Sequence, residues 1–292
     1  MKYLEKHPMI MIVIGIMGIS MSAILVRYST APSAVTAAWR LCWTVLLQTP
    51  LVFGKTQFRR ELMNVDKKTA LLSAVSGIFL AVHFFLWFES LRQTSVASAA
   101  VIVCTEVIWV SLGFCLFLKG KLSAKAVAAI AVAFGGSVLI AMADSGMGGG
   151  HLYGDVLALL AAMAAAVYML IGRIVRAGFS TTVYTYLVYS ACAVVLLLMC
   201  FAQGQSMFGY GMNAVLIGFL LALFSTILGH SIFSWCLKYF SPSFVSASKL
   251  CEPVVSSTLA AFLFGEVPGG MQLVGGVLIL GSVFYYARLE DK

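Results

Sequence analysis

Long blocks of hydrophobic residues alternate along this chain with short segments that are polar or rich in glycine and proline. Each block is about 20 residues long, the length at which a helix crosses the hydrocarbon core of a bilayer. The pattern predicts ten transmembrane helices, over residues 9–27, 33–54, 69–90, 94–118, 124–142, 154–175, 181–203, 213–236, 242–264 and 268–288. We therefore expect an all-α integral membrane protein.

The composition and the distribution of charge support this prediction. Hydrophobic residues make up 61% of the 292 and charged residues only 10%, against about 45–50% and 25% in soluble domains. Of the nineteen Lys and Arg residues, fifteen fall in the termini and in alternate loops, on one side of the predicted helices. This bias predicts that both termini are cytoplasmic and that the membrane is the inner membrane. Because the basic residues do not gather on one face, the net charge of +8 does not indicate nucleic-acid binding.

No motif in the sequence indicates a metal or a cofactor. All seven cysteines lie in apolar blocks without a C-x-x-C spacing, so we expect small buried side chains there. The glycine-rich segment SGMGGGHLYGD lacks the G-K-[ST] of a phosphate-binding loop. Lys2 and Lys6 precede the first apolar block, but no signal-peptide cleavage site follows, so this block is predicted to remain as a helix.

The two halves of the chain repeat with an offset of 146 positions, which places Glu106 on Glu252. The same offset aligns Leu91 with Leu237, Arg92 with Lys238, Ser95 with Ser241, and Gly135 with Gly281. We expect a first repeat over residues 1–143, an extracytoplasmic joint over 144–153 and a second repeat over 154–292. Five helices are an odd number, so the second repeat would be inverted in the membrane, as in many secondary transporters.

Two matching stretches carry a family resemblance. The first half contains FLWFESLRQTSVASAAVIVCTEVIWVSLGFCLFLKGKLS followed by AFGGSVLI, and the second contains FSWCLKYFSPSFVSASKLCEPVVSSTLAAFLFGEVP followed by LILGSVF. In their order of elements they resemble the drug/metabolite transporter superfamily, and within it the ten-helix proteins with two EamA-type repeats. The resemblance implies a gradient-driven carrier or a facilitator for amino acids, other small metabolites or drugs, often an exporter. Val107 and Gly120 replace the family's usual proline and acidic residue, present as Pro253 and Glu266, so the halves are not equivalent.

Glu106 and Glu252 are the first candidates for function, because each lies within a predicted membrane span. A charged side chain there costs about 2.5–3.5 kcal/mol, so it usually faces a bundle interior or a water-filled path. Either carboxylate could take up protons or bind a cationic group of a substrate. Alternatively, Lys249 could pair with Glu252, and Arg40 with Glu106. Glu106 has no lysine or proline nearby, which predicts that Glu106 titrates freely and that Glu252, beside Lys249 and Pro253, is charge-paired.

Two further basic residues and two tryptophans extend this predicted site. Arg40 and Lys249 lie within spans and could receive the carboxylate of an amino acid. Trp39 could line the same cavity or face lipid near the outer interface. Trp87 lies in a dense aromatic run that could form a pocket wall or an interfacial anchor.

His83 and His230 occupy nearly matching places, 147 positions apart against the offset of 146. Both could relay protons, or both could be hydrogen-bonded core residues. One residue of slip turns a helix by about 100°, so the two rings need not face the same way.

We expect a secondary transporter that exports small amphipathic metabolites, amino acids or related compounds, by alternating access. The alternative substrate class is organic cations or drugs, coupled to protons through Glu106. Other classes are a channel, although no filter-like segment repeats, and an intramembrane enzyme that would use Glu106 and His83, although no catalytic motif is present. The expected partners are a small-molecule substrate, the lipid bilayer and protons, with the protein as a monomer or a dimer.

Overall fold

The computed structural model describes residues 7–94, 96–144, 152–176, 178–255, 258, 259 and 269–290, and these residues form helices and short connections without a strand. The first half contains α2 (Pro8–Arg27), α3 (Ser33–Gly54), α4 (Thr56–Met63), α5 (Lys67–Gln93), α6 (Val96–Cys104), α7 (Glu106–Phe117) and α8 (Ala124–Asp144). The second contains α9 (Leu152–Arg176), α10 (Thr181–Ala202), α11 (Gly211–Leu220), η1 (Leu221–Ser231), α12 (Ile232–Cys236), α13 (Pro242–Ser248), η2 (Lys249–Cys251) and α15 (Gly270–Glu290). Most of the predicted joint and the end of the predicted span 242–264 lie outside the described residues.

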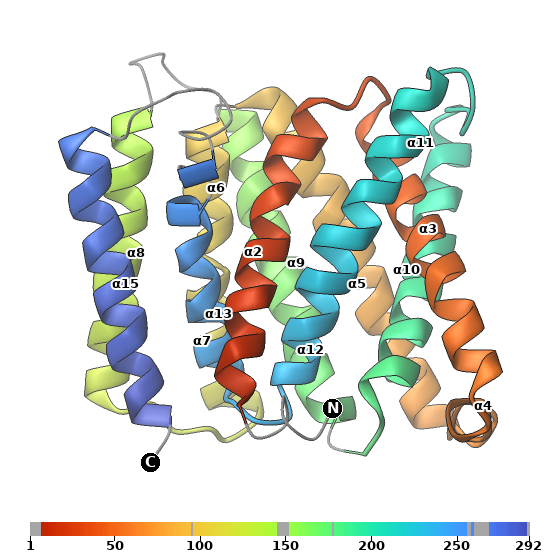
Figure 1. Cartoon of the computed structure of the whole chain (residues 1–292), viewed down its shortest axis with the longest axis horizontal. Coiled ribbons are helices and arrows are strands. Elements are labelled where there is room, and N and C mark those ends of the chain that lie inside the picture. Colours follow the sequence, from red (N-terminus) through yellow and green to blue (C-terminus); the bar gives the residue numbers. More distant parts are fainter. Residues whose placement is uncertain are drawn as a thin grey trace.

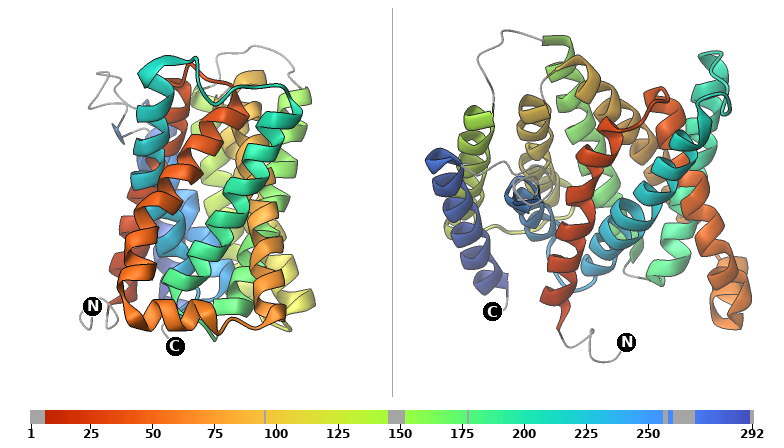
Figure 2. Two further views of the ribbon diagram at one scale, coloured as in Figure 1. Left: turned by 90° about the vertical axis from the view of Figure 1, so that its right-hand side faces the viewer. Right: turned by 45° about the horizontal axis from the view of Figure 1, so that its top comes forward.

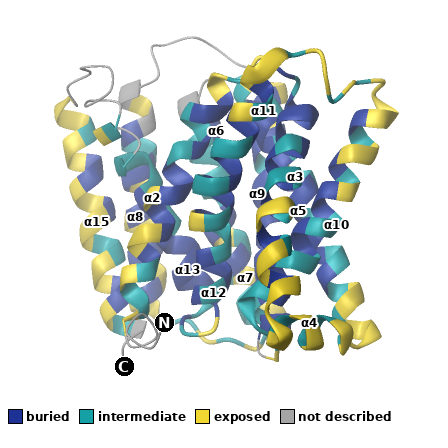
Figure 3. Cartoon of the chain, turned by 45° about the vertical axis from the view of Figure 1, so that its right-hand side comes forward, coloured by how far each residue is buried: buried dark blue, intermediate teal, exposed yellow. Residues whose placement is uncertain are grey.

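The described residues confirm that the protein is all-α and that its helices are apolar enough for a membrane. Within the described residues, seven helices are long and apolar enough to cross a membrane: 8–27, 67–93, 99–117, 152–176, 181–202, 211–236 and 270–289. Large apolar side chains on the outward faces are exposed, as in Phe117, Phe201 and Val277. Figure 3 shows exposed residues along the outer helices α10 and α15 and buried residues toward the middle of the bundle. An apolar outer surface of this extent suits contact with lipid.

The helices stand side by side as one bundle, with α8 and α15 packed together at one edge (Figure 1). α2 begins and α15 ends at the same end of the bundle. α4 lies across that end, as the turned view in Figure 2 shows, and no span was predicted for its residues. Elsewhere in the bundle α5 packs on α9, α10 packs on α3 and α5, and α2 packs on η1.

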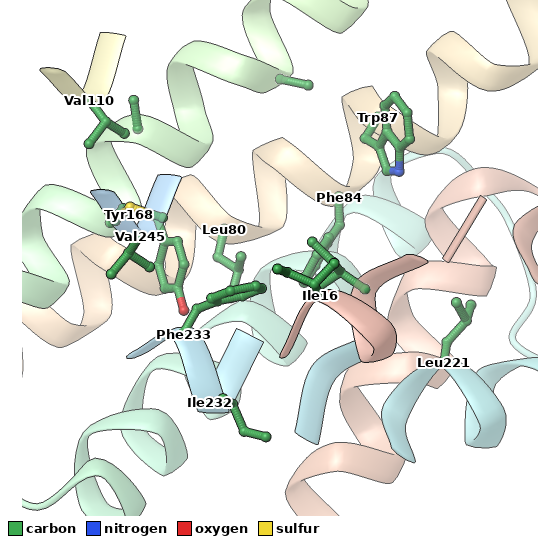
Figure 4. Packing of buried hydrophobic residues seen from close by; sticks show 14 of the residues in the cluster. Ile16, Leu80, Phe84, Trp87, Val110, Tyr168, Leu221, Ile232, Phe233 and Val245 are labelled. Carbon is green, nitrogen blue, oxygen red and sulfur yellow. The ribbon is translucent and has the colours of Figure 1, made fainter. Parts of the chain in front are cut away.

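The buried core joins large aromatic residues to faces of small ones. Figure 4 shows part of it, with Phe84 from α5, Phe233 from α12 and Ile16 from α2. α9 contributes a buried alanine face that includes Ala158 and Ala161. Small residues allow helix backbones to approach closely, which is the main packing device between helices in a membrane.

Two predicted spans are interrupted at matching places. α6 ends at Cys104 and α7 begins at Glu106, with Thr105 between them. The Thr105 hydroxyl donates to the carbonyl of Ile102 at 2.7 Å, and a side chain that competes for backbone groups in this way weakens a helix. In the second half, the 3₁₀ turn η2 ends at Cys251, directly before Glu252. The predicted span 94–118 is therefore divided at Thr105 into α6 and α7, while residues 99–117 together remain long and apolar enough to cross a membrane.

The predicted span 213–236 is helical, but its middle part, η1, is a π-helix. Two hydroxyls donate to carbonyls five residues earlier, Thr226 Oγ1 to Leu221 at 3.3 Å and Ser231 Oγ to Thr226 at 3.1 Å. The wider turn, with its i→i+5 bonds, places different residues on one face than an α-helix does, and π-helical turns frequently occur at functional sites.

The crossing of α8 and α15 generates a first prediction. A Cβ added to Gly136 would lie 2.7 Å from the carbonyl oxygen of Gly275, and a Cβ on Gly275 would lie 2.7 Å from that of Gly136. We expect Gly136→Ala to lower the melting temperature of the detergent-solubilised protein by several degrees, because overpacking costs about 1–3 kcal/mol.

The adjacent Gly135 provides the matched control, since a Cβ there meets nothing within 4 Å. Gly135→Ala should leave the melting temperature unchanged or raise it slightly, because alanine favours a helix over glycine by about 1 kcal/mol. Equal melting temperatures for the two variants would show that α8 and α15 are not packed this closely.

Candidate functional site

Charged and polar side chains from both halves of the chain line one small cavity inside the bundle. Its volume is about 50 Å³. The lining residues are Ile19, Ser22, Arg40, His83, Phe84, Trp87, Val103, Glu106, Ser225, His230, Lys249 and Glu252. The structure therefore brings together seven of the eight predicted site residues.

Glu106 and Lys249 form an ion pair across the two halves. Lys249 Nζ lies 2.8 Å from Glu106 Oε1, and the side chains are 13% and 9% exposed for the lysine and the glutamate. The ammonium also lies 5.6 Å from the centre of the Phe233 ring, within the range of a cation–π contact. The prediction that Glu106 is the free carboxylate is wrong, because Lys249 reaches across to α7.

Glu252 lines the cavity, but its carboxylate has no ion-pair partner among the described residues. The predicted pair with Lys249 is not formed, although the two residues are neighbours in sequence. The repeat gives a reason for the asymmetry. An offset of 146 places Val103 where Lys249 stands in the other half, and Val103 lines the cavity together with Glu252. The lysine that would complete the reciprocal pair is a valine.

Arg40 of α3 is 1% exposed and is held at two points. Its Nε donates to Thr226 Oγ1 at 2.7 Å, and its guanidinium carbon lies 3.9 Å from the centre of the Phe84 ring. Its Nη2 has no hydrogen-bond partner among the described residues. No ion pair joins Arg40 to Glu106 in this part of the chain, so the alternative predicted from the sequence is not observed.

The two histidines face one another across the cavity. Their ring centres are 6.2 Å apart, and His230 lies edge-on to Phe84 at 5.1 Å. His83 Nδ1 lies 2.9 Å from the carbonyl oxygen of Ala161. A carbonyl only accepts, so Nδ1 carries a proton and Nε2 is the nitrogen that can exchange one. His230 lies in the π-helix η1, which turns by less than the roughly 100° per residue of an α-helix, so an α-helical projection does not give the direction of its side chain.

The two predicted tryptophans lie in different places. Trp87 is buried and lines the cavity. Trp39 does not line it, because its indole Nε1 donates to the carbonyl of Met207 at 3.0 Å and its ring packs edge-on against Phe208. Its contacts tie α3 to the segment before α11.

Sequence reasoning missed the polar residues of η1. Ser225 lines the cavity, is fully buried, and its hydroxyl has no partner among the described residues. Thr226 positions Arg40. The sequence did contain a signal for them, because two adjacent hydroxyl residues lie inside an apolar block shortly before His230. Which way their side chains point, however, depends on the π-helical turn.

Comparison with known proteins identifies the family. The sequence profile of the EamA-like transporter family matches residues 7–142 and again residues 152–288. The chain belongs to the EamA-like transporter family. This membership confirms the resemblance seen in the two repeats and indicates a transporter rather than an enzyme.

Individual relatives of this EamA-like protein are distant. An uncharacterized transporter of Clostridium kluyveri is 26% identical over 222 residues, which cover 73% of this chain and 71% of that protein. A probable amino-acid metabolite efflux pump of Salmonella typhimurium is 38% identical over 80 residues, 27% of each chain. A solved crystal structure is similar with a TM-score of 0.79 at 17% identity, and the match covers 98% of this chain and 99% of that one. At this identity it shows the fold alone.

The ion pair generates a second prediction. Glu106→Gln leaves the Lys249 ammonium buried without a counter-charge, and breaking a buried pair in this way costs about 3–5 kcal/mol. We expect a large fall in the melting temperature. Glu252→Gln should lower the melting temperature less, because Glu252 has no ion-pair partner among the described residues.

The double variant Glu106→Gln/Lys249→Met is the control for this interpretation. It removes both charges, so its melting temperature should recover most of what Glu106→Gln loses. The single variant Lys249→Met completes the comparison. If the fall in melting temperature of the double variant equals the sum of the falls in the two single variants, the two residues are not directly coupled.

Proposed function

We propose that this protein is a secondary transporter that exports small amphipathic metabolites, amino acids or related compounds, by alternating access. In this proposal ten transmembrane helices form two inverted five-helix repeats, and the substrate binds between them. One observation carries the proposal: acidic and basic residues from both halves line a single cavity within an apolar bundle. Transporters built from inverted repeats bind their substrates at such an interface.

The cavity is too small for a typical ligand, which supports a mechanism in which the two repeats move apart to admit the substrate. About 50 Å³ is far below the roughly 300–1,000 Å³ of typical ligand pockets. At one end of the bundle, Thr94 Oγ1 donates to Asp155 Oδ1 at 2.8 Å, and the Thr30 amide donates to Asn213 Oδ1 at 3.0 Å. At the other end, the Ser180 amide donates to Glu61 Oε1. Each set joins the two halves, so rocking of the repeats would break one set while the other holds.

The charged residues take different roles in this mechanism. The Glu106–Lys249 pair joins the halves and must rearrange whenever the cavity opens between them. Glu252 has no ion-pair partner among the described residues and is available to a proton or to a cationic group of the substrate. His83 and His230, which line the same cavity, would relay protons.

An exporter of organic cations or drugs is the second candidate. The aromatic residues Phe84 and Trp87, which line the cavity beside Glu252, favour it. Arg40 and Lys249 oppose it, because a substrate with only positive charge does not need two basic residues at its site.

Flux measurements on the purified protein in liposomes provide the third prediction. We expect saturable exchange of a labelled L-amino acid. The rate of exchange should fall at least about tenfold in Glu252→Gln, because this variant lacks the carboxylate that would bind the proton or the ammonium group. Glu89→Gln is the control. Glu89 accepts hydrogen bonds from Ser33 and Gln93 and does not line the cavity, so this variant should retain flux.

Other outcomes of the flux experiment distinguish the remaining classes. Ohmic currents without saturation would identify a channel. Chemical conversion of the solute without flux would identify an enzyme. Exchange of organic cations with no exchange of any amino acid would favour the second candidate.

The orientation generates a fourth prediction. Both ends of the described chain lie at the same end of the bundle as α4, which carries Arg59 and Arg60. By the positive-inside rule this end is cytoplasmic. A fluorescent protein fused after Lys292 should therefore fold and fluoresce in a bacterial host, while alkaline phosphatase fused there should stay inactive. Active phosphatase would reverse the proposed topology.

A further inference from the structure

Two hydrogen-bond donors that line the cavity have no partner among the described residues. They are Nη2 of Arg40 and the hydroxyl of Ser225, both on fully or almost fully buried side chains. Buried donors are nearly always paired, and leaving one unpaired costs free energy. Two unpaired donors on one cavity therefore indicate an acceptor that arrives from outside the chain.

The chain holds these two donors in a fixed relation. Thr226 accepts from Arg40 Nε at 2.7 Å, and Ser225 is its neighbour on η1. Phe84 packs against the guanidinium, with 3.9 Å between its ring centre and the guanidinium carbon. One nitrogen of the guanidinium is thus satisfied inside the protein while Nη2 remains for a ligand. A planar guanidinium with a hydroxyl beside it suits a carboxylate, whose two oxygens accept several hydrogen bonds.

The charge balance of the cavity adds a second constraint. Lys249 and Glu106 neutralise one another at 2.8 Å. Arg40 and Glu252 remain, one positive and one negative, without an ion pair between them or to any other described residue. A ligand with one carboxylate and one ammonium matches these two residues. The apolar part of the wall, which includes Ile19, Phe84 and Trp87, suits an apolar or aromatic side chain.

We propose that Arg40 and Ser225 form the carboxylate subsite of this protein, and that Glu252 receives the ammonium group of the same ligand. The substrate class is then zwitterionic α-amino acids with apolar or aromatic side chains. This assignment rests on the proposed transport function, and it gives a direction to the bound substrate: carboxylate toward α3 and η1, ammonium toward Glu252.

Three ligands that share a phenyl ring test the subsite on the detergent-solubilised full chain by calorimetric titration. L-phenylalanine carries both charges, 3-phenylpropionate only the carboxylate, and 2-phenylethylamine only the ammonium. We expect phenylalanine to bind most tightly. Ser225→Ala should weaken phenylalanine and phenylpropionate by about tenfold and leave phenylethylamine unchanged, since only the carboxylate loses a hydrogen bond. Arg40→Gln should weaken the same two ligands more strongly.

Ser73→Ala is the matched control. Ser73 is fully buried and its hydroxyl has no partner among the described residues, but it does not line the cavity. This variant should bind all three ligands as the unaltered protein does. Ser225→Ala removes a hydroxyl that bonds to no described residue, so it keeps the test available if Arg40→Gln does not fold.

The outcomes separate this proposal from the transport function. Equal weakening of all three ligands by Ser225→Ala, or tighter binding of phenylethylamine than of phenylalanine, would overturn the carboxylate subsite even if liposomes show transport. Failure of every standard L-amino acid to bind would overturn it as well. The expected binding pattern in a protein that moves no solute would retain the subsite and reject the transporter.

Discussion

The ion pair between Glu106 and Lys249 makes it possible for this bundle to carry charge in its interior. Two acidic and two basic residues, Glu106, Glu252, Arg40 and Lys249, line a cavity within helices whose outer faces are apolar. An isolated charge in such surroundings is costly, and a charge paired at 2.8 Å is much less so. Because one partner comes from each half, the contact that neutralises the charges also holds the halves together. With Glu106 and Lys249 paired, one basic residue, Arg40, and one acidic residue, Glu252, remain on the cavity wall without an ion pair among the described residues.

The unequal halves explain why the described residues contain one such pair and not two. Glu106 and Glu252 occupy corresponding positions, and each follows directly on an interruption of its helix, at Thr105 in the first half and at η2 in the second. Lys249, however, corresponds to Val103. A symmetric chain would contain two cross-half pairs and no free carboxylate. With valine at position 103 in place of a lysine, Glu252 has no ion-pair partner among the described residues, so the two corresponding acids differ in their surroundings.

The sequence predicted much of the fold and less of the site, for identifiable reasons. Apolar length and loop charge located the helices, since the bilayer imposes both. The repeat located Glu106 and Glu252, and α3 and η2 brought Arg40 and Lys249 to the same cavity. The pairing was not predicted, because it depends on which helix faces which across the halves. The sequence offered Lys249 for Glu252 and Arg40 for Glu106, whereas Lys249 pairs with Glu106. Ser225 and Thr226 were missed because a π-helical turn changes which residues share a face, and Trp39 because its partner, the Met207 carbonyl, lies in a distant segment.

The close crossing of α8 and α15 has a mechanical consequence. At Gly136 and Gly275 the backbone of each helix occupies the space where the other would need a side chain, and Ile140 and Ile279 flank the contact. Sliding of one helix along the other would drive these isoleucines into the opposite backbone. Rotation about the crossing point moves them least. The close contact therefore fixes the position of α8 and α15 along one another and leaves rotation about the crossing as their least hindered relative movement.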